Sequence, residues 1–248
     1  MTQPNTTDPY LLLWFEAPLQ SWGADSKFGR RDTLKFPTKS GVLGLVCSAL
    51  GAGGEQTELL ARFASLDMQV ISYRKTKPNG QKRDKEPLLR DFQMVGSGYD
   101  EKDPWQNLLI PKKADGSKPN GAGTKMTYRY YLQDAVFAVA LQVPTDLTES
   151  IAQALQNPNW DIYLGRKNCI PTELVFQGQC DDFDSVSNQA WLLAKQKNLI
   201  EDFRVLQGEI EGDEHLTLND VPIQFGEHKK YRDRQVTVLY IQEEAVDG

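Results

Sequence analysis

The sequence predicts an α+β protein built on a ferredoxin-like (RRM-like) sheet with the element order βαββαβ. Three observations lead to this fold class. Strand-like and helix-like stretches follow one another in that order between residues 10 and 170. Five prolines from Pro78 to Pro119 interrupt any period, which indicates a long insertion. The 248 residues are 40% hydrophobic and 25% charged, enough for one large domain or two small ones.

The pattern divides the chain into three parts. We expect a core made of residues 1–74 and 126–170, a thumb-like insertion at 75–125, and a β-rich extension at 171–248 packed on the core. The first predicted strand is the apolar stretch Tyr10–Ala17.

A buried helix is predicted over Val42–Leu50, because small and apolar residues fill this run. Ser40 or Thr38 can cap its start, and Gly51 can stop it.

The remaining elements follow from the same kinds of pattern. The sequence predicts, in order, a helix at Glu55–Ala64, a strand at Met68–Arg74, strand character at Thr127–Val143, a helix at Asp146–Gln156, a short strand at Trp160–Leu164, a helix at Ser187–Lys197 and a strand at Phe203–Leu206. A hairpin closes the chain, with strands at Val221–Phe225 and Gln235–Ile241 and its tip at Glu227–Arg234. RNA-recognition folds of this order leave one face of the sheet open to single strands.

Cysteine and histidine content argues against several kinds of site. Cys47, Cys169 and Cys180 form no CxxC pair, so a disulfide framework or a cysteine-based zinc site is not expected. Two histidines, His215 and His228, are too few for a multi-histidine metal centre. We expect no metal and no cofactor. No signal peptide or membrane span fits the sequence, so a cytoplasmic protein without a membrane partner is expected.

The net charge of -6 hides an uneven distribution along the chain. Residues 74–90 contain seven basic and two acidic residues, and residues 20–39 contain five basic and two acidic ones. Residues 171–228 contain twelve acidic and three basic residues. A basic run is either a solvated surface or a surface that binds a phosphate backbone, and two such runs make the second interpretation competitive.

The segment 37–41 is the strongest physical candidate for a phosphate contact. A helix start offers free backbone N–H groups and partial positive charge, and Gly41 would allow a phosphate to approach closely. Lys39 and Ser40 add a cation and a hydroxyl donor. The alternative is a plain N-cap with a solvated lysine. Three upstream cations favour the phosphate contact: Arg30, Arg31 and Lys35.

Aromatic residues and one turn are further candidates. Trp22 lies in a polar segment, where its indole either stacks on a base or fills the edge of the core or a subunit interface. Tyr128 and Tyr130 share one strand face and form either a stacking platform or an ordinary half-buried surface. Residues 165–168 combine a glycine with two adjacent cations, which suits either a single-strand backbone or an exposed turn.

Four sequence blocks resemble one known family. They are LLWFEAPLQSWG at 12–23, FGRRDT at 28–33, PTKSGVLGL at 37–45 and YLGRKNCIP at 163–171. In this order and spacing they resemble the CasD family, whose members are subunits of the type I-E CRISPR surveillance complex Cascade and belong to the RAMP superfamily. The basic insertion and the C-terminal third match only in general layout.

The resemblance implies a ferredoxin-like core with a protruding thumb. It implies a protein of antiviral defence that holds the 5′ handle of CRISPR RNA (crRNA), caps the backbone of CasC subunits and neighbours the large subunit CasA. Target DNA would be met only through the assembled complex. The candidate RNA-binding residues are Gln20, Ser21, Trp22, Lys27, Arg30, Arg31, Lys39, Ser40, Gly41, Arg74, Lys75, Arg83, Tyr128, Arg129, Gly165, Arg166, Lys167 and Asn168.

The histidines bear on whether the protein is an enzyme, because metal-independent RNA cleavage needs a base and an acid. His215 lies in an acidic stretch that would repel a phosphate, and His228 beside Lys229, Lys230 and Tyr231 is more often an exposed surface residue. We therefore expect a non-catalytic RNA-binding subunit. The alternative is a metal-independent endoribonuclease that processes precursor CRISPR RNA with His228, Tyr231 and Lys229. A third interpretation is an unrelated ferredoxin-like domain that binds only proteins.

Overall fold

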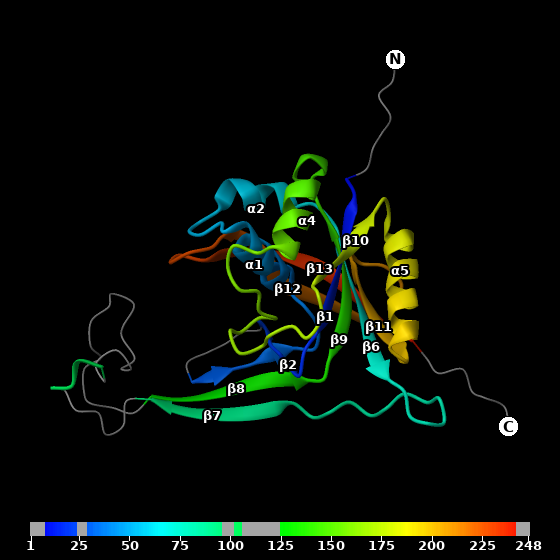
Figure 1. The fold of residues 1–248 in the computed structure, drawn as a ribbon, viewed down its shortest axis with the longest axis horizontal. Coiled ribbons are helices and arrows are strands. Elements are labelled where there is room, and N and C mark those ends of the chain that lie inside the picture. Colours follow the sequence, from blue (N-terminus) through cyan, green and yellow to red (C-terminus); the bar gives the residue numbers. More distant parts are fainter. Residues whose placement is uncertain (1–7, 24–28, 96–101, 106–124, 242–248) are drawn as a thin grey trace, which may run out of the picture.

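The computed structural model describes residues 8–23, 29–95, 102–105 and 125–241, and Figure 1 shows its fold. Its largest element is an antiparallel sheet of seven strands in the order β10-β1-β9-β6-β11-β13-β12. The strands are β1 (Tyr10–Glu16), β6 (Met68–Lys75), β9 (Val136–Gln142), β10 (Phe176–Cys180), β11 (Leu199–Gln207), β12 (Glu214–Gln224) and β13 (Lys230–Tyr240). Strands from both ends of the described chain therefore belong to one sheet.

Helices cover both faces of this sheet (Figure 1). One face carries α1 (Lys39–Leu50), α2 (Thr57–Phe63) and α4 (Thr148–Gln156) with the 3-10 turn Thr145–Leu147, and the other carries α5 (Phe183–Gln196). Strand β1 shows why both faces are covered. Leu11, Leu13 and Phe15 belong to the core on the α1 side, whereas Leu12 and Trp14 belong to the core on the α5 side.

Helix α5 corrects the expectation of an open sheet face. Val186, Ala190 and Ala194 follow one another at a spacing of four residues, and all three are buried. They pack against the second face of the sheet together with apolar residues such as Ile71. That face is too apolar to remain in water, so it is part of the core and offers no platform to a single strand here.

A smaller sheet projects from this body (Figure 1). Strands β7 (Leu89–Val95) and β8 (Lys125–Gln133) pair antiparallel, and we call this pair the arm. The short strands β2 (Leu19–Gln20) and β4 (Arg30–Arg31) also pair with β8, while β3 (Trp22–Gly23) pairs with β5 (Thr33–Leu34). Segments on either side of β3 thus anchor the root of the arm.

Most predicted elements are confirmed within a few residues, and the result is a mixed α/β fold dominated by antiparallel sheets. The strand expected at Trp160–Leu164 is wrong. This segment is irregular, because its polar groups bond to non-strand partners: Ser48 Oγ donates to the carbonyl of Asp161. The edge position beside β1 is instead taken by β10, which the pattern did not predict. The last hairpin is also longer than expected, because β12 begins at Glu214.

Candidate functional site

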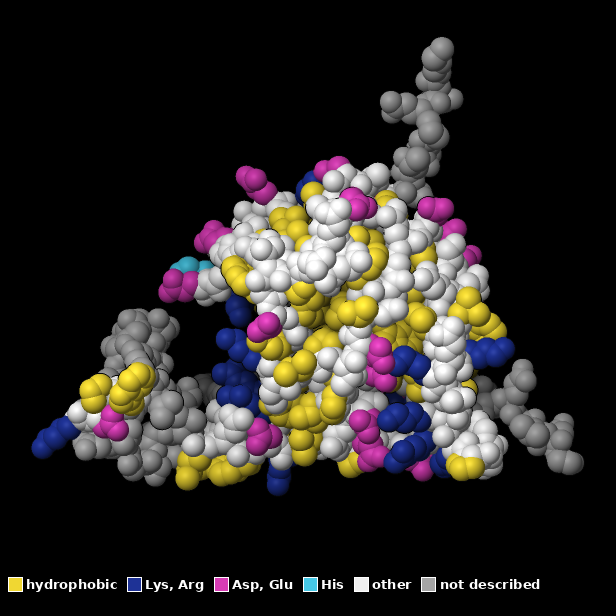
Figure 2. Space-filling model, in the orientation of Figure 1, with side chains coloured by type: hydrophobic (Ala, Val, Ile, Leu, Met, Phe, Trp, Pro, Cys, Tyr) yellow, Lys and Arg dark blue, Asp and Glu magenta, His cyan; other side chains and the backbone are white. Residues whose placement is uncertain are grey.

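A groove of about 540 Å³ lies where several distant segments meet. Its lining comes from residues 21–32, from the first turns of α1, from the loop at 161–166 and from the β12–β13 tip at 225–231. Three of these segments belong to the predicted sequence blocks. Figure 2 shows Lys and Arg side chains gathered in the hollow between the β12–β13 tip and the arm. The structure therefore assembles the predicted blocks around one basic groove.

Gly165 fixes the loop beside the groove. Its φ is 97°, in the left-handed region that favours glycine, and a Cβ there would stand 1.6 Å from the carbonyl oxygen of Ser21. The Ser21 amide donates to the carbonyl of Leu164 at 3.1 Å, which holds the two backbones together. The glycine is needed for this packing of backbone on backbone, and Ser21 acts as its buried partner.

Trp22 belongs to the interior of the protein. Its side chain is buried, its ring stacks on Phe15 with centroids 5.3 Å apart, and its Nε1 donates to Gln20 Oε1. A Cβ on Gly41 would lie 2.9 Å from the indole, so helix α1 packs directly on the ring. Both faces of the indole are engaged, which supports the core interpretation over base stacking. Gln20 is likewise an internal residue, since its Nε2 donates to the carbonyls of Phe15 and Ala135.

The start of α1 is already occupied by an anion of the protein itself. Thr38 caps the helix by accepting from the Gly41 amide, as expected. The Lys39 amide donates to Oδ2 of Asp220 at 2.8 Å, and Asp220 lies on β12. A carboxylate is stabilised at this position by the same N–H groups and helix dipole that would bind a phosphate. Ser40 and Gly41 line the groove, but the helix start is largely satisfied from within.

Lys39 is buried rather than presented to a phosphate. Its side chain is 1% exposed, and its ammonium donates to the carbonyl of Leu66. Burial, and secondly the nearby guanidinium of Arg234, lower the pKa of Lys39 to about 8. The sequence had no local signal for this, because the partners come from residues 66 and 220–234.

The groove takes its positive charge from Arg31, Arg166 and Lys229. Arg31 and Lys229 are exposed, and neither forms an ion pair with a carboxylate in the described part of the chain. Arg30 alternates with Arg31 along β4 and is engaged elsewhere: it pairs with Asp32 at 2.8 Å and lies over the Tyr130 ring. Two cations are therefore free to meet a phosphate backbone.

Arg166 ties together the elements behind the groove. Its guanidinium donates to the carbonyls of Tyr130 at 3.0 Å and Arg31 at 2.8 Å, and it lies 4.6 Å from the centre of the Tyr131 ring. These contacts join the loop at 161–166 to β8 and β4. Arg166 thereby places the backbone of Arg31, although two of its donor groups are already used.

Carboxylates in the groove do not cancel this charge. Asp32 is paired with Arg30, and Asp161 accepts a hydrogen bond from the Tyr163 hydroxyl at 3.2 Å. The other predicted cations lie at a different place. Arg74, Lys75 and Arg83 line a second cavity and pair with Asp202, Asp134 and Glu86, respectively.

The remaining candidates lie around the groove or beyond it. Arg129 is opposite Arg31 in the β4–β8 register, and Tyr128 is half-exposed and packs on Phe92 with ring centroids 5.1 Å apart. Lys167 and Asn168 are exposed in the turn next to Arg166. Lys27 lies outside the described residues.

The β12–β13 tip is the part of the site that sequence reasoning placed in the wrong context. Lys229 and Tyr231 were considered only as catalytic residues, yet both line the groove. His228 is exposed beside them, and burial raises the pKa of Tyr231. No His, Cys, Asp and Glu cluster that could hold a metal occurs among residues the structure describes. None of the described helices has the length and apolar run needed to cross a membrane.

Comparisons with known proteins agree with the sequence blocks. Residues 10–237 match the family described as CRISPR-associated protein (Cas_Cas5). The CRISPR system Cascade subunit CasD of Escherichia coli (strain K12) is 28% identical over 240 residues, which are 93% of this chain and 89% of that protein. A chain in a solved CRISPR RNA-guided surveillance complex is similar with a TM-score of 0.65 and 28% identity, over 93% of this chain and 89% of the other. A crystal structure of a Cas protein shares the fold, with a TM-score of 0.52 and 24% identity over 93% and 92% of the two chains.

Proposed function

This chain belongs to the Cas5 family of CRISPR-associated proteins, and from this premise we propose that it is a non-catalytic RNA-binding subunit of a Cascade-type surveillance complex. In the proposal the groove holds the 5′ handle of crRNA. The chain caps the CasC backbone next to CasA in the cytoplasm, and it meets target DNA only through the assembled complex. Its similarity to a CasD subunit and to a chain of an RNA-guided complex supports this placement.

The strand order supports the finer fold assignment within the proposal. Strands β10-β1-β9-β6 have the order of a ferredoxin-like unit, with α1 and α2 between β1 and β6 and with α4 between β9 and β10. The arm would be its thumb.

One observation carries the RNA-binding proposal: two exposed cations without carboxylate partners, Arg31 and Lys229, line the groove where the family's sequence blocks meet. Cations of this kind bind phosphates and release counterions, which gives affinity without base recognition. Gly165 and Arg166 hold the loop behind them and would keep the groove in shape.

The groove also favours binding over cleavage. A general base must accept a proton near neutral pH, whereas burial moves the pKa of Tyr231 upward, away from that range. His228 is exposed at the tip and is not among the groove-lining residues. The endoribonuclease stays the second candidate because Tyr231 and Lys229 do line the groove.

The test compares RNA affinity of the reconstituted complex carrying Arg31→Glu with Lys229→Glu against the wild type over a range of salt concentrations. Loss of two phosphate contacts should lower the slope of log K against log salt by roughly one to two units. Lys195→Glu on α5, outside the groove, is the matched charge control and should leave the slope unchanged. An unchanged slope in the double variant with normal circular dichroism would refute the groove.

A second measurement separates binding from catalysis. Purified protein is incubated with labelled repeat RNA in EDTA. We expect intact RNA. Site-specific cutting that His228→Ala abolishes would replace the binding proposal by the endoribonuclease.

A further inference from the structure

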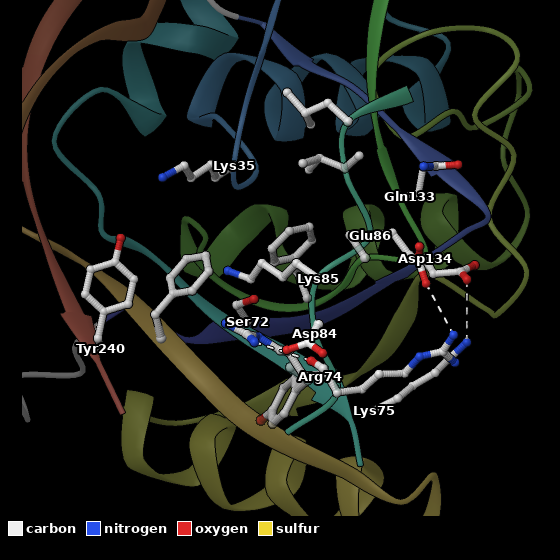
Figure 3. Close-up of a pocket in the computed structure, with 17 residues that line it drawn as sticks. Lys35, Ser72, Arg74, Lys75, Asp84, Lys85, Glu86, Gln133, Asp134 and Tyr240 are labelled. Atoms are coloured by element: carbon white, nitrogen blue, oxygen red, sulfur yellow. Dashed lines mark hydrogen bonds and ion pairs between the residues drawn. The ribbon is translucent and has the colours of Figure 1, made fainter. Parts of the chain in front are cut away.

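A second cavity, of about 320 Å³, opens at the root of the arm, and we call it the root pocket (Figure 3). Ser72 and Phe137, which are opposite each other on β6 and β9, line it together with Phe203 of β11. Leu88 and Leu132 add apolar surface from the root of the arm. The root pocket shares no lining residue with the groove, so it is a separate site.

Charged groups lie inside this apolar cavity. Asp202 is buried and is bridged by Arg74 at 2.9 Å and by Lys85 at 2.7 Å. The Lys85 ammonium also lies 4.7 Å from the centre of the Phe203 ring, and Figure 3 shows Lys85 extending into the pocket. Nε of Arg74 is buried and has no hydrogen-bond partner among the described residues. The pocket thus presents aromatic surface, cationic donors and an acceptor to one small volume.

The cations around the pocket are not equivalent. Four of the five pair with carboxylates: Arg74 and Lys85 with Asp202, Lys75 with Asp134, and Arg83 with Glu86. Lys35 forms no ion pair with any carboxylate that the structure describes, and its side chain is exposed. In Figure 3 it lies on the far side of the pocket from Lys75. Lys35 is therefore the cation that an outside anion can reach at least cost.

We propose that the root pocket binds a single nucleotide, with the base among Phe137, Phe203 and the apolar residues and the phosphate at Lys35. A base stacks on aromatic surface whatever its sequence, and its edge carries both donors and acceptors. The hydroxyl of Ser72 and the Arg74–Asp202 pair offer the complementary groups. A purely apolar anchor from a protein partner would leave the buried Arg74 donor unpaired, which the nucleotide avoids.

The test titrates the purified full-length chain with each of the four ribonucleoside 5′-monophosphates by calorimetry. At least one should bind the wild type. Lys35→Glu should weaken that binding by at least about tenfold, the effect of losing a charge-assisted contact. Ala135→Phe, which fills the pocket from the turn before β9, should abolish it with an unchanged circular dichroism spectrum. Lys195→Glu makes the same charge change on α5 and should bind like the wild type.

Failure of all four nucleotides to bind, or equal binding by wild type, Lys35→Glu and Ala135→Phe, overturns the proposal. If no nucleotide binds but Ala135→Phe blocks incorporation into the complex, the pocket receives a protein side chain instead. The groove is judged by the salt dependence of affinity for long RNA and the root pocket by mononucleotides, so each can fail alone.

Discussion

Lys39 shows at the scale of one residue how burial changes the role of a basic side chain. It stands in a sequence that suits phosphate binding, yet its ammonium bonds to the Leu66 carbonyl inside the protein. Next to Arg234 and away from water, the charged form is disfavoured, and the pKa of Lys39 falls from the ordinary 10.5 to about 8. Lys39 is therefore a group whose charge costs stability at neutral pH.

This gives a pH-dependent prediction. Between pH 8 and 10.5 the unfolded chain holds a proton on Lys39 that the folded chain has released, so the free energy of unfolding rises with pH in that window. Relative to Lys39→Met, the wild type should gain about 1.5 kcal/mol between pH 8 and pH 9.5. Urea unfolding of both proteins measures this. The buried tyrosines and cysteines also titrate at high pH, but both proteins carry them. A constant difference across the window would mean that Lys39 keeps an ordinary pKa.

At the scale of an element, the loop at 161–166 is shaped by one glycine. Gly165 meets the Ser21 backbone at a distance that no side chain could share, and its backbone is left-handed as well. Arg166 then reaches β8 and β4 from this loop. The loop is thus a spacer that sets the position of a groove wall.

Gly165→Ala should lower the free energy of unfolding by at least about 3 kcal/mol, because strain and backbone overlap add. Gly80→Ala is the matched control: its φ is 82°, but nothing lies within 4 Å of the added carbon. That change should cost only about 1–2 kcal/mol. Denaturant melts of the two variants give the comparison, and equal losses would contradict the packing role of Gly165.

The arm is an element with two unlike faces. Phe92, Met94, Met126 and Tyr128 are exposed on one face, where β7 and β8 place them opposite each other in pairs. The other face carries Arg129, which is opposite Arg31 on β4. An exposed apolar strip of this kind marks an interaction surface.

We expect Phe92→Ser with Met94→Ser to leave the Tm of the isolated chain within a few degrees, because neither side chain is buried. The same variant should be lost from the complex when it is pulled down with CasC and RNA, since apolar contacts of the arm would be missing. Thr57→Ser, a conservative change at the exposed start of α2, serves as the pull-down control. Normal recovery of the arm variant would rule out this face as a subunit contact.

At the scale of the whole molecule, Asp220 joins the two ends of the chain. It accepts from the start of α1 and pairs with Arg234 at 2.7 Å, so the β12–β13 pair is fastened to the N-terminal helix. The same pairing brings the tip at 225–231 to the groove. The acidic C-terminal part thereby completes a basic site.

Asp220→Ala should lower the free energy of unfolding by about 3–5 kcal/mol, because it leaves the buried guanidinium of Arg234 without its partner. Asp32→Ala removes an exposed pair with Arg30 and should cost under about 1 kcal/mol. Urea unfolding compares the two. A small loss in Asp220→Ala would show that Arg234 finds water or another partner.

The sequence by itself determined the elements whose signals are local, together with the family. The apolar run of β1, the Thr38 cap and the Gly51 stop of α1 depend on neighbours a few residues away, and the four blocks identify the relatives. Only the tertiary structure decided which candidate side chains face solvent. Trp22, Lys39 and the Asp220 carboxylate lie within 4 Å of partners far along the chain, and burial and pairing depend on those partners. The free cations of the groove are what remains after such pairing, which no local pattern can specify because charge pairing is settled by distance in space.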